Sequence, residues 1–196
     1  MDADDIEGFW IRVYLNPVNG LHIACADRSY RDLNRTLRGL AKEQTKEKYN
    51  LVRGRLINYS FELVTTDFKD QQYFDIEHKS VCDKLIKIFN EEYCDVKMTY
   101  GQVQKWVNMY LKYLFALGEN RVSGISKNYQ YFHIPIDNII QDELRKDKGI
   151  ARMTEPWSKI NCYDTYLEYQ KQVREVYLKS IPMDIEFRLF NKSFNN

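Results

Sequence analysis

Two opposed stripes of side chains run along residues 23–42. Apolar side chains recur at steps of three and four, which is the period of one buried helix face, at Ile23, Ala26, Tyr30, Leu33, Leu37 and Leu40. Cationic side chains recur at the same steps and fall nearly opposite the apolar ones, at Arg28, Arg31, Arg35, Arg38 and Lys42. This pattern predicts one amphipathic helix from about residue 21 to about residue 48, broken or bent at Gly39.

Apolar periodicity and capping residues predict further helices over residues 75–94, 100–117, about 135–146 and 163–180. The helix over 100–117 has the clearest boundaries. Thr99 and Gln102 form a capping-box pattern, in which each side chain can satisfy the other's free backbone N–H. Gly118 stands where a left-handed C-terminal cap is expected. Apolar side chains cover most of this helix, which indicates a central position in the fold.

Other segments are less regular. Residues 5–16 fit either a short helix or a strand, and residues 51–66 show no clean period, so we expect them to be irregular or partly extended. Residues 129–134 form a short aromatic segment compatible with extended backbone. Residues 183–189 alternate apolar and polar side chains, which favours a half-buried strand. The candidate pairing partners of that strand are residues 9–15 and 56–64.

The predicted fold is therefore mainly α. We expect a single domain over residues 1–196, built as a helical bundle around the apolar helix at about 100–117, with a small β element at the C-terminus. A length of 196 residues suits one domain, and 44% hydrophobic residues suffice for a sizeable core. No repeat, low-complexity tract or flexible linker divides the chain.

Cysteine usage and hydropathy indicate the compartment. The cysteines lie far apart and form no CxxC pair, so we expect reduced, intracellular thiols at Cys25, Cys82, Cys94 and Cys162. The acidic N-terminus shows no secretory signal, and no apolar run approaches the ~20 residues of a membrane span. We expect a soluble, cytoplasmic protein without membrane association.

Charge is uneven along the chain, although the net charge is only +1. Residues 28–55 hold nine Lys and Arg against three Asp and Glu, whereas residues 62–95 hold nine Asp and Glu against four Lys. The cations from Arg28 to Lys42 form what we call the basic row. This row is either a solvated face, neutralised by the acidic segments of the same chain, or open to an external partner.

An open basic row favours contact with nucleic-acid phosphates. Arginine forks match phosphate oxygens, and evenly spaced cations along a helix can follow a nucleic-acid backbone without reading bases. The first hypothesis is therefore a non-catalytic protein that binds nucleic acid or another polyanion through Arg28, Arg31, Arg35, Arg38 and Lys42. The alternative is a protein–protein interaction module that binds an acidic partner or forms a homo-oligomer.

A second cluster of polar side chains lies on the most apolar helix. Lys105, Asn108 and Lys112 share one face at i, i+3 and i+7, and His133 belongs to a candidate pocket wall. Two ammonium groups and an amide beside a buried helix could hold a small anionic ligand or form part of an enzyme site, because a buried lysine must be paired or neutral. The competing interpretation is a narrow solvent-exposed seam, or salt bridges to neighbouring helices.

Motifs for other chemistry are missing from the sequence. There is no GxSxG, no HExxH, and no glycine-rich phosphate loop of the GxxxxGK or GxGxxG type. His78 and Cys82 share a helix face at i, i+4, but tetrahedral zinc needs further paired ligands that are not nearby. We expect no metal and no cofactor, and the sequence leaves open whether the protein is catalytic.

Overall fold

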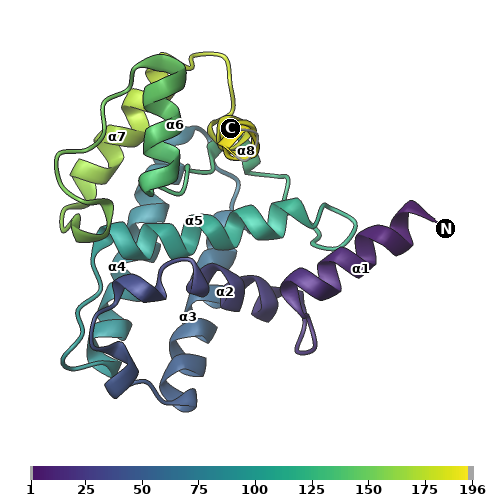
Figure 1. Ribbon diagram of the computed structural model, residues 1–196, viewed down its shortest axis with the longest axis vertical. Coiled ribbons are helices and arrows are strands. Elements are labelled where there is room, and N and C mark those ends of the chain that lie inside the picture. Colours follow the sequence, from purple (N-terminus) through teal and green to yellow (C-terminus); the bar gives the residue numbers. More distant parts are fainter. Residues whose placement is uncertain (1, 194–196) are drawn as a thin grey trace.

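The computed structural model describes residues 2–193 and is mainly helical, as predicted (Figure 1). Within these residues it has eight α-helices and no strand. The helices are α1 (Ala3–Leu15), α2 (Leu21–Arg31), α3 (Lys46–Thr65), α4 (Gln71–Glu92), α5 (Tyr100–Ala116), α6 (Asn138–Lys148), α7 (Tyr163–Val176) and α8 (Pro182–Ser193). Short 3₁₀ turns lie between them at η1 (Asn34–Thr36), η2 (Leu40–Lys42), η3 (Tyr129–Tyr131) and η4 (Trp157–Lys159).

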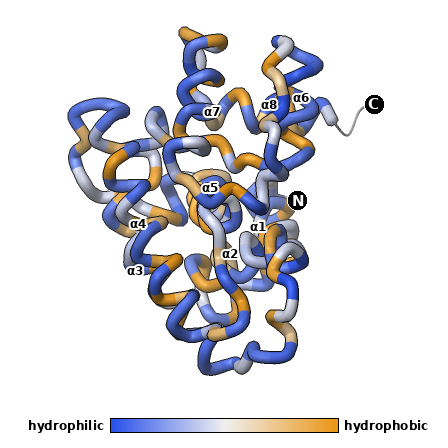
Figure 2. The backbone as a smooth tube through the Cα atoms, turned by 90° about the vertical axis from the view of Figure 1, so that its left-hand side faces the viewer, coloured by the Kyte–Doolittle hydropathy of each residue, from blue (hydrophilic) through white to orange (hydrophobic). Residues whose placement is uncertain are grey.

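Helix α5 matches the prediction over 100–117 and is almost entirely buried. Its N-terminus has the predicted capping box: the Thr99 hydroxyl accepts from the Gln102 N–H, and the Gln102 side chain accepts from the Thr99 N–H. Gly118 follows the helix at φ +80°, a left-handed conformation that glycine adopts without strain. Helix α5 packs against α2, α3, α4 and α7, and Figure 2 views it nearly end-on.

Three other predicted helices are also present. Helix α4 covers most of residues 75–94, and α6 ends at Lys148, followed by Gly149, whose φ of +70° provides a left-handed cap. Helix α7 covers most of residues 163–180 and buries the side chains that its period places inward, namely Tyr166, Tyr169, Val173 and, just after the helix, Tyr177. These segments share clear apolar periods.

The single basic helix predicted over 21–48 is wrong, because α2 ends at Arg31. The residues that follow are rich in Asp, Asn and Thr, which favour turns over helix interiors. The Thr36 hydroxyl donates to the Leu33 carbonyl (2.7 Å), and Gly39 at φ +88° precedes η2. The apolar positions of the stripe are nevertheless buried, at Leu33, Leu37 and Leu40. The basic row therefore runs along a helix end and two 3₁₀ turns.

The predicted C-terminal strand is also wrong, because residues 183–189 lie within α8. Pro182 occupies the first helical position, where its missing N–H costs nothing. The buried positions are Pro182, Met183, Ile185, Glu186 and Leu189, and most of them fall at helical steps of three and four. The pattern looked like a strand because Glu186, a charged residue, is one of the inward positions.

The remaining segments are helical or irregular. Residues 51–66 lie almost wholly in α3 rather than in extended backbone, and residues 5–15 form most of α1. The aromatic segment 129–134 begins with η3 and continues without forming a strand. All four cysteines are free, with Cys25 and Cys82 buried. Within residues 2–193, no helix has the length and hydropathy needed to cross a membrane.

Candidate anion-binding site

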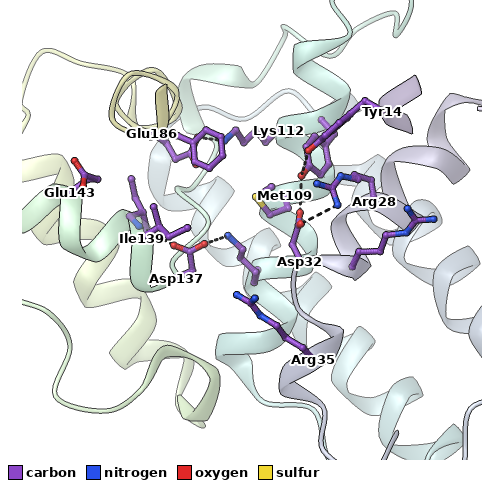
Figure 3. A pocket seen from close by; sticks show the side chains of 15 residues that line it. Tyr14, Arg28, Asp32, Arg35, Met109, Lys112, Asp137, Ile139, Glu143 and Glu186 are labelled. Carbon is purple, nitrogen blue, oxygen red and sulfur yellow. Dashed lines mark hydrogen bonds and ion pairs between the residues drawn. The ribbon is translucent and has the colours of Figure 1, made fainter. Parts of the chain in front are cut away.

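A charged cavity of about 200 Å³ lies where α2, α5, α6 and α8 approach one another (Figure 3). It collects cations from both clusters that the sequence singled out: Arg28, Arg31 and Arg35 from the basic row, and Lys105 and Lys112 from α5. Four carboxylates also line it, namely Asp32, Asp137, Glu143 and Glu186. Segments far apart in sequence thus contribute to one site.

Both lysines of α5 are buried and paired with carboxylates. The Lys105 ammonium lies 2.5 Å from the Asp137 carboxylate, and Lys112 lies 2.5 Å from that of Glu186. The Lys112 ammonium also lies 4.9 Å and 4.5 Å from the ring centroids of Phe187 and Phe190. Burial lowers the pKa of Lys112 and raises the pKa of Glu186. In each case the charge of the partner shifts the pKa in the opposite direction. The charges of both ammonium groups are therefore already balanced by carboxylates of the chain.

Arg28 is also occupied. Its guanidinium lies 3.6 Å from the Asp32 carboxylate and 4.5 Å from the centroid of the Tyr14 ring. The Tyr113 hydroxyl donates a hydrogen bond to the same carboxylate at 2.7 Å. Arg28 is therefore a positioned residue at the wall of the cavity, tied to α1 and α5.

Arg31 and Arg35 differ from the other cations of the cavity. Both are exposed at its mouth, and neither side chain makes a hydrogen bond or ion pair with residues 2–193. Arg38 and Lys42 are likewise exposed and without an ion pair to the described residues, but they do not line the cavity. Four of the five residues of the basic row are thus open.

The acidic segments of the chain do not cover these four residues. Across residues 62–95, Glu62 and Glu77 pair with Lys84, and Asp83 pairs with Lys79. Two more carboxylates of this segment pair with cations elsewhere in the chain: Asp67 with Lys127, and Asp75 with Arg174. The excess of negative charge in this segment is thus partly neutralised without the basic row.

Asn108 and His133 lie apart from the cavity, in a buried polar network. The Asn108 amide donates to the Tyr166 hydroxyl (2.8 Å) and accepts from His78 Nε2 (2.9 Å). His133 contacts the same hydroxyl through Nδ1 (2.8 Å) and the Asp75 carboxylate through Nε2 (2.6 Å). The structure therefore divides the predicted ligand cluster between the cavity and the core.

The His78–Cys82 pair belongs to this network. Cys82 Sγ lies 3.7 Å from His78 Nδ1, and both residues are completely buried. Burial raises the pKa of the Cys82 thiol well above its ordinary value, which disfavours the thiolate that a metal requires. No group of three or more metal-binding side chains occurs within the described part of the chain.

Sequence reasoning missed the carboxylates of the cavity. The alternation over residues 183–189 places Glu186 on the exposed face of a strand, and no pattern marks Asp137 as a partner of Lys105. A helical reading of residues 182–189 would have placed Glu186 inward, and a buried carboxylate requires a buried cation. No family model, curated protein or solved structure matches this chain. Its function is therefore inferred from its residues and their geometry.

Proposed function

We propose that this protein is a non-catalytic binding protein whose basic row contacts nucleic-acid phosphates. The observation that carries the proposal is the open state of Arg31, Arg35, Arg38 and Lys42, whose side chains have no carboxylate partner within residues 2–193. Each exposed guanidinium offers a planar fork of donors that suits phosphate oxygens. No feature of the row points to recognition of base edges, so binding is expected to be independent of sequence.

Two features favour an external polyanion over a solvated surface. The nearby carboxylates are already engaged: Asp27 accepts hydrogen bonds from Tyr49 and Arg53, and Glu43 accepts one from the Asp95 N–H. The turns that follow α2 also hold the cations on fixed backbone, because Leu33 and Leu37 anchor them in the core. The positive charge is therefore both unneutralised and positioned. An acidic protein partner would meet the same surface and is the alternative that binding experiments must separate.

A small anionic ligand is a second candidate, favoured by the cavity itself. Arg31 and Arg35 stand at the mouth of a space of about 200 Å³, and the lysines behind them are held by Asp137 and Glu186. A single phosphate or carboxylate group at this mouth could receive hydrogen bonds from both guanidinium groups. Asn108 and His133 do not line this space.

The test is a charge-reversal experiment with a matched control. In fluorescence anisotropy with labelled single- and double-stranded oligonucleotides, Arg31→Glu/Arg35→Glu should weaken binding by roughly tenfold or more. Lys171→Glu/Lys179→Glu changes the net charge equally, at exposed positions on or after α7, and should leave affinity within about twofold of wild type. Equal binding by the Arg31→Glu/Arg35→Glu variant and wild type would refute the proposal.

Two further measurements separate the alternatives. Binding to polyglutamate with no binding to RNA or DNA would favour an acidic partner. A rise in melting temperature with inorganic phosphate that is lost in Arg35→Ala would favour the small-anion site, because only a ligand of the native state raises that temperature.

A further inference from the structure

Helix α1 carries an apolar face that the rest of the described chain leaves uncovered. It projects from the body of the molecule (Figure 1) and packs against the core through Ile11 and Leu15 on one side. The opposite side exposes four large apolar side chains at i, i+3, i+4 and i+7, with exposed fractions of 45%, 57%, 61% and 59%: Ile6, Phe9, Trp10 and Val13. Such a contiguous stripe is typical of a helix that packs against a second helix.

A groove beside the stripe extends this apolar surface. It has a volume of about 430 Å³, lies between α1, α5 and α8, and includes Trp10, Ile11, Leu15, Ala116 and Phe187 in its lining. Trp10 belongs both to the stripe and to the groove, so the two are continuous. A partner on the stripe would therefore find further apolar area next to it.

The charges beside the stripe indicate which partner fits. Asp5 and Arg12 lie seven residues apart, hence on nearly the same edge of the helix and about two turns from each other. Neither side chain makes a hydrogen bond or ion pair with the described residues. Two copies of α1 packed antiparallel would bring each Asp5 close to Arg12 of the partner subunit, whereas parallel packing would face like charges.

The apolar positions fit nearly the same arrangement, with a centre one residue along the helix from that of Asp5 and Arg12. With a two-fold axis between positions 9 and 10, Ile6 meets Val13 of the partner subunit, and Phe9 meets the partner's Trp10. The order of the apolar side chains and the flanking charges are thus both compatible with antiparallel pairing of two copies. We propose that the protein self-associates as a two-fold symmetric dimer through antiparallel packing of α1 against α1. This proposal goes beyond polyanion binding and uses none of Arg31, Arg35, Arg38 and Lys42.

A lipid surface fits the same stripe less well. Asp2, Asp4, Asp5 and Glu7 place four carboxylates on the N-terminal half of the helix, which anionic headgroups would repel. One short helix buries less than the ~800 Å² per partner of a standard interface. We therefore expect a reversible dimer with a dissociation constant on the order of micromolar.

The first test is the mass of the whole chain in solution. Sedimentation equilibrium over a concentration series should show a monomer–dimer equilibrium for wild type, and Phe9→Ser/Val13→Ser should weaken it by roughly tenfold or more. The control is Leu178→Ser, which removes an apolar side chain that is 83% exposed and outside α1; it should leave dimerisation unchanged. Circular dichroism confirms that each variant is folded. A monomeric wild type at hundreds of micromolar, or an unaffected double variant, would overturn the proposal.

A charge swap tests the orientation. Asp5→Arg and Arg12→Asp should each weaken the dimer, and the two changes combined should restore it, because every pair is then again of opposite charge. Failure of the combined variant to recover would contradict the antiparallel arrangement. Wild type should also remain unbound in flotation with phosphatidylcholine–phosphatidylserine vesicles, and binding through Phe9 and Val13 would overturn the assignment of the stripe to a second copy. Both sets of variants keep the basic row intact, so this test and the oligonucleotide test can fail separately.

Discussion

At the scale of single residues, the hydrogen bonds of the core place a proton on Nε2 of two buried histidines. The Asn108 amide nitrogen donates to Tyr166, so its oxygen accepts, and the His78 Nε2 that it faces must carry the proton. His133 likewise needs a proton on Nε2 to donate to Asp75, and its Nδ1 accepts from the Tyr166 hydroxyl. Arg174, at 2.9 Å, balances the Asp75 carboxylate, so His133 need not be charged.

These histidines make stability depend on pH. Burial lowers the pKa of His78 well below 6.5 and also lowers that of His133, although Asp75 opposes the second shift. The unfolded chain therefore binds more protons below pH 6.5, and stability falls as pH drops. Each histidine contributes a loss of up to about 1.4 kcal/mol per pH unit until its folded pKa is reached. Urea unfolding at pH 7.5, 6.5 and 5.5 should show this decline.

Substitutions assign the decline to its source. His78→Gln and His133→Gln should each flatten the curve between pH 6.5 and 5.5. His22→Gln should flatten it less, because partial burial also lowers the pKa of His22 but this residue is exposed whereas His78 and His133 are fully buried. A stability that is flat over this range in wild type would show that the rings bind protons as readily in the fold as in the unfolded chain. Below pH 4 a second loss is expected. Burial favours protonation of Asp75, but His133 and Arg174 outweigh it and hold the pKa of Asp75 at about 2, so the stability this carboxylate provides disappears as pH falls toward 2.

At the scale of elements, Gly101 allows η4 to approach the first turn of α5. Its N–H donates to the Ile160 carbonyl (3.1 Å), and a Cβ at this position would lie 1.6 Å from the Trp157 carbonyl oxygen. Gly101→Ala should therefore cost about 2–3 kcal/mol, because backbone rather than a flexible side chain must move. The matched control is Gly54→Ala within α3, where nothing lies within 4 Å of the added carbon; it should gain roughly 0.5–1 kcal/mol. Chemical denaturation of both variants tests the contrast, and equal effects would contradict it.

Elements with a strong apolar period or clear capping residues could be predicted from the sequence even where polar side chains point inward, as in α4 and α5. Helices α3 and α8, where a polar inward residue breaks a weaker pattern, could not. Helix α5 could be predicted from its capping box and its largely apolar surface. In α3 the buried positions Val52, Leu56, Ser60 and Leu63 follow a helical period, but Ser60 interrupts the apolar pattern. In α8, Glu186 likewise interrupts the apolar pattern of the buried positions, and it is buried because Lys112 pairs with it. Local patterns cannot show that a polar side chain will find its partner elsewhere in the chain.

At the scale of the whole molecule, the candidate site was predictable in its cations and not in their partners. The sequence shows the basic row and the lysines of α5, but it does not show that Lys105 and Lys112 are paired and that Arg31 and Arg35 are open. That distinction depends on contacts between distant segments, such as Lys105 with Asp137 and Lys112 with Glu186. A count of charged residues in a window of sequence therefore gives the number of cations, whereas the folded structure determines which of them lack a carboxylate partner.

The salt dependence of binding counts the cations that meet phosphates, so it can be compared with the number of open residues in the basic row. If Arg31, Arg35, Arg38 and Lys42 each neutralise one phosphate of a DNA duplex, log K should fall with log salt at a slope of about −3.6, which is a loss of roughly a hundredfold between 50 and 200 mM. Arg38→Ala/Lys42→Ala should reduce the slope to about −1.8. Lys171→Ala/Lys179→Ala removes the same charge elsewhere and should leave the slope unchanged. Anisotropy titrations at four salt concentrations measure all three slopes. Equal slopes in the three proteins would mean that the phosphates contact another surface. The slope reflects only the counterions that are released where cations of the protein contact phosphates.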